Sequence, residues 1–310
     1  MSISKSPSKL SLPQDNPGVN TVLEYLIIKF PRIKPAIWQQ RMAQGKVHWH
    51  DGTLISKDCV FQAQQRVYYY REVTEEPSIP FKEEIIFQDD LLLVAYKPHF
   101  LALTPGGPFV NECLQQRLRE KTGNDQLQAL HRLDRVTAGL VLFSLNANSR
   151  RQYHALFESR KMEKTYHAIA LAHKGDNIVD KKWTIKNRIT RGPQDFRMQI
   201  ETGEANTHSE IHCIEQTGER SLFELKPVTG KTHQLRLHMA SIGRPILFDK
   251  YYPNLQEESE DNYKQPLQLL AKTLKFIDPI TQQKREFTTN KTLSMVDSVV
   301  DSLVDSVADG

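Results

Sequence analysis

The spacing of apolar and polar positions divides the chain into a short first region and a longer second one. Apolar residues recur every three to four positions over residues 22–30 and 36–44, which predicts two helices. An aromatic-rich run over residues 66–70 predicts a strand that closes this unit. Together these elements predict a small α/β module over residues 19–73. Residues 1–18 are rich in Ser, Pro and Lys and are expected to be disordered.

A proline-containing linker is predicted over residues 74–81, followed by a large domain over residues 82–290. Its strands are expected at residues 85–87, 91–95, 139–145, 164–171, 197–201, 208–216, 221–228, 267–276 and 284–287, and its helices at residues 110–121, 148–160 and 232–242. Short turns join these strands more often than crossover helices do. The pattern therefore predicts an α+β domain with a mainly antiparallel, mixed sheet flanked by helices. Residues 291–310 repeat Val-Asp-Ser and are expected to form a low-complexity acidic tail.

Charge and composition narrow the class of protein. The 310 residues include 41 Lys and Arg against 37 Asp and Glu, and the acidic residues gather in the tail and in residues 256–261. The basic body fits a nucleic-acid ligand without requiring one. No apolar run approaches the length of a membrane span, and three widely spaced cysteines do not suggest a disulfide framework. We expect a cytoplasmic, monomeric protein with no membrane partner.

The most chemically distinctive segment is residues 131–140, HRLDRVTAGL. It places Asp134 between Arg132 and Arg135, close to His131 and directly before a predicted strand. Nearby positive charge favours an ionised carboxylate, which suits a nucleophile better than a proton donor. A surface carboxylate paired with neighbouring arginines is the simpler alternative.

Two other patterns are weaker. Residues 229–232, TGKT, resemble the end of a phosphate-binding loop, but that motif needs a glycine where Leu225 stands. The spacing of His208, His212 and Cys213 fits no common zinc site. We therefore expect neither a metal nor a nucleotide cofactor.

Residues 131–140 resemble the HRLDR-x-T-S-G-L signature of the RluA-type RNA pseudouridine synthases, with Ala138 in place of Ser. Further segments resemble that family in the same order over residues 83–289. They are residues 161–168 (its K-x-Y-x-A strand), residues 227–240 (its P-x-T-G-R-T-H-Q-I-R-V-H-L-A segment) and residues 242–249, with Phe248 where Gly is usual and Asp249 retained.

This resemblance implies a pseudouridine-synthase-like fold and isomerisation of uridine in RNA, without cofactor or metal, on a base turned out of its stack. It implies that Asp134 is the catalytic nucleophile, acting at C1′, at C6 of uracil or through an elimination. Arg236 would pair with Asp134. Tyr166 would cover the uracil ring, and its hydroxyl is a candidate for moving the C5 proton.

The resemblance also implies a substrate-binding set around these three residues. Arg132 would fill the gap left by the extruded base, since its planar guanidinium can stack and bind phosphate. His233 lies three positions before Arg236 on the predicted helix, so both share a face. The expected substrate-binding residues are Arg132, His131, Arg135, His233 and Lys164.

The module over residues 19–73 resembles a divergent S4-type RNA-binding domain. In that comparison Lys34, Arg41 and Lys46 would contact RNA, although Ile33-Lys34-Pro35 replaces the usual Ser-Arg entry to the second helix. The expected partner is ribosomal or transfer RNA. A catalytically silent RNA-binding or RNA-folding protein that retains the synthase fold is the alternative.

Overall fold

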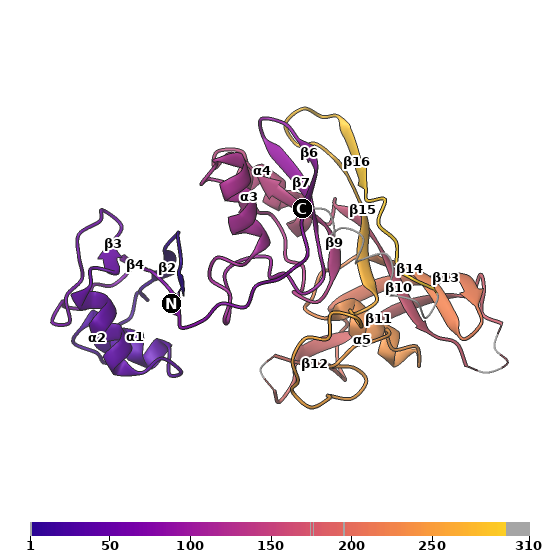
Figure 1. The fold of residues 1–310 in the computed structure, drawn as a ribbon, viewed down its shortest axis with the longest axis horizontal. Helices are drawn as coiled ribbons and strands as arrows, with labels where there is room; N and C mark the ends of the chain where they lie inside the picture. The colour runs from indigo at the N-terminus through magenta and orange to yellow at the C-terminus, as the bar shows by residue number, and fades with distance from the viewer. Residues whose placement is uncertain (1, 174, 176, 195, 296–310) are drawn as a thin grey trace. The chain divides into compact units, whose positions relative to one another are not determined.

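The computed structural model describes residues 2–295 except residues 174, 176 and 195 (Figure 1). Contacts divide these residues into two units. The small unit comprises residues 2–78 and 105–113, and the large unit comprises residues 79–104 and 114–295. The Val-Asp-Ser repeat of the predicted tail lies outside the described residues.

The small unit contains two helices packed on a three-stranded sheet. The helices are α1 (Val22–Lys29) and α2 (Pro35–Ala43), close to their predicted positions. Thr21 and Glu24 form a capping box at the start of α1, and Pro35 occupies the first turn of α2. The strands pair antiparallel in the order β2–β4–β3, and a separate pair joins β1 to β5. Their bounds are β1 (Ser2–Ile3), β2 (Ser8–Ser11), β3 (Val47–Trp49), β4 (Arg66–Tyr69) and β5 (Glu72–Val73).

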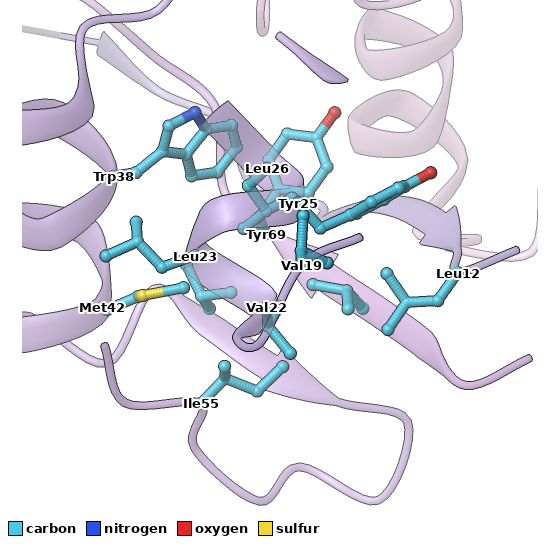
Figure 2. Packing of buried hydrophobic residues seen from close by; sticks show 12 residues of the cluster. Leu12, Val19, Val22, Leu23, Tyr25, Leu26, Trp38, Met42, Ile55 and Tyr69 are labelled. Carbon is cyan, nitrogen blue, oxygen red and sulfur yellow. The ribbon is translucent and has the colours of Figure 1, made fainter. Parts of the chain in front are cut away.

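The core of the small unit lies between the helices and one face of this sheet (Figure 2). Val22 of α1 and Trp38 of α2 are fully buried with Val47 and Val67 of the sheet. Because successive strand residues point to opposite faces, the alternate residues of β2, β3 and β4 face away from the helices.

The prediction that residues 1–18 are disordered is wrong for the described residues 2–18. Strand β2 pairs with β4 in a register that places Leu10 opposite Val67, and Leu12 is buried in the core. A polar segment with few apolar residues gains its order here from backbone hydrogen bonds to a strand more than 50 positions later. Composition alone does not report that pairing.

The large-unit boundary also differs from the prediction, because residues 105–113 fold with the small unit. The Glu76 carboxylate accepts hydrogen bonds from the backbone N–H groups of Val110, Asn111 and Glu112. Burial acts to raise the pKa of Glu76, but these bonds and one from Ser2 lower it below its ordinary value. The predicted domain at residues 82–290 thus contains a segment that belongs to the small unit.

Among the described residues, the large unit is built on one 11-stranded sheet (Figure 1). Its order is β12–β11–β13–β14–β10–β15–β9–β7–β6, with β16 on β15 and β8 on β9. The strands are β6 (Glu84–Gln88), β7 (Leu92–Lys97), β8 (Gln128–Ala129), β9 (Ala138–Ser144), β10 (Glu163–Leu171), β11 (Lys182–Arg191), β12 (Met198–Glu201), β13 (Thr207–Thr217), β14 (Arg220–Pro227), β15 (Leu269–Ile277) and β16 (Lys284–Thr288). Helices α3 (Leu114–Thr122), α4 (Arg150–Glu158) and α5 (Gln234–Ser241) accompany it. The α+β class with a mainly antiparallel sheet is confirmed.

Two predicted helices begin later than expected. Helix α3 starts at Leu114, since residues 110–112 are held by Glu76. Helix α5 starts at Gln234 and not at Thr232, because His233 adopts a left-handed backbone conformation at its N-cap (φ 54°). His233 therefore lies just outside the helix that carries Arg236.

Strands β9 and β15 pair in parallel, and their close approach depends on Gly139. Gly139 lies opposite Ala271 with φ +121°, a conformation that side chains rarely adopt. A Cβ at this position would stand 2.3 Å from the carbonyl oxygen of Ala271. The glycine thus lets β9, which directly follows the Asp134 loop, approach β15 closely.

Gly139→Ala is expected to lower the free energy of unfolding by about 3 kcal/mol or more, from strain and overpacking together. Gly123→Ala is the matched control, because Gly123 also has positive φ (+65°) but a methyl group there would meet no other atom within 4 Å. The control is expected to cost about 1 kcal/mol. Urea denaturation measures both, and equal losses would contradict the close-approach explanation.

Candidate active site

The loop that carries Asp134 connects β8 to β9 and is held in place by Lys97. Lys97 is fully buried at the end of β7, and its ammonium donates hydrogen bonds to the carbonyls of Pro98, Leu101 and Arg135 at 2.8–2.9 Å. The backbone N–H of Thr137 also donates to the Asp134 carbonyl, at 3.1 Å. Burial lowers the pKa of Lys97 well below its ordinary value, and the negative charge of Asp134 opposes that shift. These contacts fix the loop without using the Asp134 carboxylate.

Three nitrogen-bearing side chains surround the Asp134 carboxylate. Its Oδ2 lies 3.7 Å from Nε2 of His233 and 3.7 Å from Nη1 of Arg236, and its Oδ1 lies 3.8 Å from Nη2 of Arg132. These separations are longer than hydrogen bonds. The carboxylate, 20% exposed, is therefore close to positive charge while its oxygens stay open to a substrate.

Arg236 is itself fixed by Asp249. Its Nε and Nη2 donate to the two carboxylate oxygens of Asp249 at 2.7 and 2.6 Å, and its guanidinium lies over the rings of Tyr251 and Tyr252. The backbone N–H groups of both tyrosines donate to Asp249. Burial acts to lower the pKa of Arg236, but the hydrogen bonds and charge of Asp249, with that of Asp134, raise it above its ordinary value. Arg236 thus stays charged, with Nη1 left to face Asp134.

The expected residues Tyr166 and Lys164 line the same cleft, of about 520 Å³, as Asp134, Arg236 and His233. Both come from β10, where the pairing with β15 shifts register between Thr165 and Tyr166. Burial and the neighbouring Asp134 raise the pKa of Tyr166, so its hydroxyl keeps its proton at neutral pH. Burial lowers the pKa of Lys164.

His233 is neutral at physiological pH. Burial lowers its pKa to about 4, although the charge of Asp134 opposes this shift. Its Nδ1 hydrogen-bonds the Tyr252 hydroxyl at 3.0 Å, which orients the ring with Nε2 toward Asp134. His233 is therefore a polar neighbour of Asp134 and not a second cation beside Arg236.

Comparison with known proteins identifies the family. The family model described as RNA pseudouridylate synthase matches residues 91–241. The dual-specificity RNA pseudouridine synthase RluA of Haemophilus influenzae is 32% identical over 66% of this chain and 91% of its own. The tRNA pseudouridine synthase C of Vibrio cholerae is 30% identical over 64% of this chain and 87% of its own. The chain belongs to the RluA-type RNA pseudouridine synthases.

The fold of this synthase agrees with a solved relative. Human RNA Pseudouridylate Synthase Domain Containing 1 aligns with a TM-score of 0.56 and 23% identity, covering 76% of this chain and 98% of that one. The family assignment makes the chain an isomerase, which favours an enzyme over the catalytically silent alternative. No helix of the described residues has the length and apolar content needed to cross a membrane.

Of two further residues of the synthase that were expected to bind substrate, Arg135 is engaged elsewhere, whereas His131 lines the cleft with its ring held by neighbouring residues. Arg135 points away from the cleft, where its guanidinium pairs with Asp261 and reaches the carbonyl of Phe100. The ring of His131 stacks on Phe157, and its Nε2 accepts the backbone N–H of Leu142. Burial lowers the pKa of His131 to about 4, so it braces the loop as a neutral ring.

Two of the three cations expected to contact RNA in the small unit share one carboxylate partner. Arg41 is buried with its guanidinium over Trp38, and both Arg41 and Lys46 form ion pairs with Glu72. The RNA contacts expected of Arg41 and Lys46 therefore stay a prediction: Arg41 is buried, and Lys46 is part-exposed but already paired with Glu72. Lys34 is exposed at the N-cap of α2.

Sequence reasoning missed the supporting residues Lys97 and Asp249. Both lie within the range that resembles the family. The sequence does not show that Lys97 is buried under the Asp134 loop or that Asp249 forms an ion pair with Arg236. Phe248 adopts φ +61°, a left-handed conformation that favours glycine, in agreement with the resemblance in which Phe248 stands in place of Gly. Among the described residues, no three His, Cys, Asp or Glu side chains cluster as metal ligands would.

Asp249→Asn is expected to reduce synthase turnover by about 10²-fold, because Arg236 loses its charged partner and its alignment toward Asp134. The free energy of unfolding should fall by about 3 kcal/mol or more, as one partner of a buried ion pair is neutralised. Asp261→Asn is the matched control, since Asp261 pairs with Arg135 outside the cleft. A folded Asp249→Asn variant with wild-type turnover would contradict the positioning role.

Acid is expected to destabilise the synthase between pH 6.5 and pH 4. Burial lowers the pKa of His99, His131, His233 and His238 to about 4. In this window the unfolded chain binds protons that the native state does not, so stability falls by about 1.4 kcal/mol per pH unit for each such proton. Urea denaturation at pH 7 and pH 5 measures the loss, and His99→Asn should reduce the slope. A free energy of unfolding that is independent of pH over this range would contradict the burial of neutral histidines.

Proposed function

We propose that this synthase converts specific uridines in structured ribosomal or transfer RNA to pseudouridine, with Asp134 as the nucleophile acting on a base turned out of the helix. The observation that carries the proposal is the placement of the Asp134 carboxylate. It is accessible in the cleft, lies 3.7 Å from the fixed guanidinium of Arg236 and forms no direct hydrogen bond to either arginine beside it. Such a carboxylate lies beside positive charge and keeps its oxygens open to a substrate.

The cleft supports base flipping by its size. A uridine within a helix cannot present its sugar or base edge to a side chain, so it must leave the stack before reaction. A cleft of about 520 Å³ lies within the usual range for sites that bind small molecules, roughly 300–1,000 Å³. Arg132, whose side chain is 66% exposed at the rim, is suited to occupy the space that the base leaves.

The reaction needs no cofactor, because substrate and product are isomers. The N1–C1′ bond breaks and a C5–C1′ bond forms, while C5 loses a proton and N1 gains one. Whether Asp134 attacks C1′, adds to C6 or takes a proton in an elimination, it must carry a negative charge. Arg236 supports that charge, and Tyr166 covers the uracil ring. Because the Tyr166 hydroxyl is protonated, it moves the C5 proton only as a relay, passing its own proton on as it accepts the one from C5.

Two further residues support binding of the nucleotide. Lys164 and His233 line the same cleft, where Lys164 supplies positive charge toward the phosphate backbone and neutral His233 supplies a ring nitrogen near the sugar. The names of the relatives from Haemophilus influenzae and Vibrio cholerae support RNA, including transfer RNA, as the substrate class.

Asp134→Asn is expected to lower pseudouridine formation by about 10³-fold or more while RNA affinity changes less than about threefold, because only a charge is removed. Mass spectrometry of RNA after incubation measures the product, and fluorescence anisotropy measures binding. Asp90→Asn, in the exposed turn between β6 and β7, controls for the substitution itself. Wild-type turnover in the Asp134→Asn variant would contradict the assignment of Asp134 as the nucleophile.

A further inference from the structure

The small unit has a polar, aromatic surface on the side of its sheet that faces away from the helices. Val67 and Tyr69 of β4 point into the core, with Tyr69 visible there beside Trp38 (Figure 2). Tyr68 lies between them in β4 and so points to the opposite side. We call the residues on that side the aromatic face: Lys9, His48, His50, Arg66, Tyr68 and Tyr70.

Strand register brings the centre of this face together. Lys9 of β2 and His48 of β3 lie directly opposite Tyr68 on its two sides. The rings of His48 and Tyr68 are stacked, with centroids 5.5 Å apart and planes inclined by 13°. His50 Nδ1 hydrogen-bonds the Tyr68 hydroxyl at 3.1 Å, and Tyr70 lies next to His48. The face is therefore a set of rings held in place before any ligand binds.

The charge of this face is one-sided. Lys9 and Arg66 are exposed, and none of the strands β2, β3 and β4 contains an acidic residue. The nearby Glu72 is already paired with Arg41 and Lys46. Asp51, which follows His50 and interacts with it electrostatically, lies outside these strands. Aromatic rings on strands that carry cations and no carboxylate are suited to a polyanion with flat, stackable groups.

We propose that the aromatic face binds a single-stranded segment of the RNA substrate, with bases stacked on Tyr68 and His48 and phosphates near Lys9 and Arg66. The inference rests on the proposed function only in that RNA is the substrate of the enzyme. It is separate from the predicted RNA contacts of Arg41 and Lys46, which are both paired with Glu72. Single-stranded RNA exposes its phosphates and also the faces of its bases. Duplex RNA exposes its phosphates but keeps the base faces stacked.

The test is binding of a fluorescein-labelled single-stranded RNA dodecamer to the full chain, followed by fluorescence anisotropy. Tyr68→Ala is expected to weaken binding roughly tenfold through the lost stacking, whereas Tyr68→Phe should bind like the wild type. Lys9→Glu is expected to weaken binding and to reduce its dependence on salt. Because Lys9 is exposed, this variant keeps the test valid if Tyr68→Ala fails to fold.

Lys29→Glu is the matched control, because it makes the same charge change on the exposed side of α1. Cross-linking of RNA containing 4-thiouridine provides a second readout, with the adduct expected on residues 67–71. Wild-type binding by both Tyr68→Ala and Lys9→Glu, an equal loss in Lys29→Glu, or adducts confined to the large unit would each overturn the proposal. A face that binds a protein and not RNA would give the first of these results.

Failure of the RNA-binding proposal can be distinguished from failure of the proposed catalytic role of Asp134. Asp134→Asn should lose turnover and keep dodecamer binding, whereas the aromatic-face variants should weaken dodecamer binding and raise the KM for substrate RNA. Loss of the aromatic-face effect with normal behaviour of Asp134→Asn would overturn only the binding inference.

Discussion

The buried ion pair between Arg236 and Asp249 is the interaction on which the cleft depends. A guanidinium placed at 3% exposure needs a well-aligned carboxylate to offset its desolvation, and Asp249 meets that need with both oxygens. Asp249 is itself aligned by the backbone N–H groups of Tyr251 and Tyr252. The pair therefore ties α5 to the segment that follows it and leaves one nitrogen of Arg236 for Asp134.

A second buried cation, Lys97, fixes the loop that carries the reactive carboxylate. Its hydrogen bond to the Arg135 carbonyl ties this loop to the segment after β7, where Lys97 also bonds the carbonyls of Pro98 and Leu101, so the Asp134 side chain is not used for anchoring. The Arg236–Asp249 ion pair and the hydrogen bonds of Lys97 set the geometry of the site, and the Asp134 carboxylate remains accessible. This arrangement is what electrostatic preorganisation requires of a site in which charge changes during the reaction.

Elements with a strong local pattern could be predicted from the sequence, and elements that depend on distant partners could not. The apolar run of β9 and the alternation of β13 and β14 could be recognised because those strands bury whole faces. Strand β11 was missed, because its residues are mostly polar and part-exposed and its order comes from pairing with β12 and β13. The order of β2 has the same origin.

The same distinction between local pattern and distant partners applies to the residues of the active site. The motif around Asp134, with Tyr166 and Arg236, could be found because those residues stand in recognisable segments. The partners that decide whether a cation is free could not, since Asp261 is 126 positions from Arg135 and Glu72 is 31 positions from Arg41. His233 lines the cleft as expected of a residue near Arg236, but its left-handed backbone outside the helix and its neutral, buried ring could not be predicted from the local sequence.

A crystal structure of the Asp134→Asn variant bound to a substrate RNA tests the central claim most directly. The account predicts a uridine turned out of its stack, its ring against Tyr166, with C1′ or C6 within about 3.5 Å of the side chain at position 134. A target uridine that stays stacked in the RNA, or one bound with residue 134 out of reach of both atoms, would contradict it.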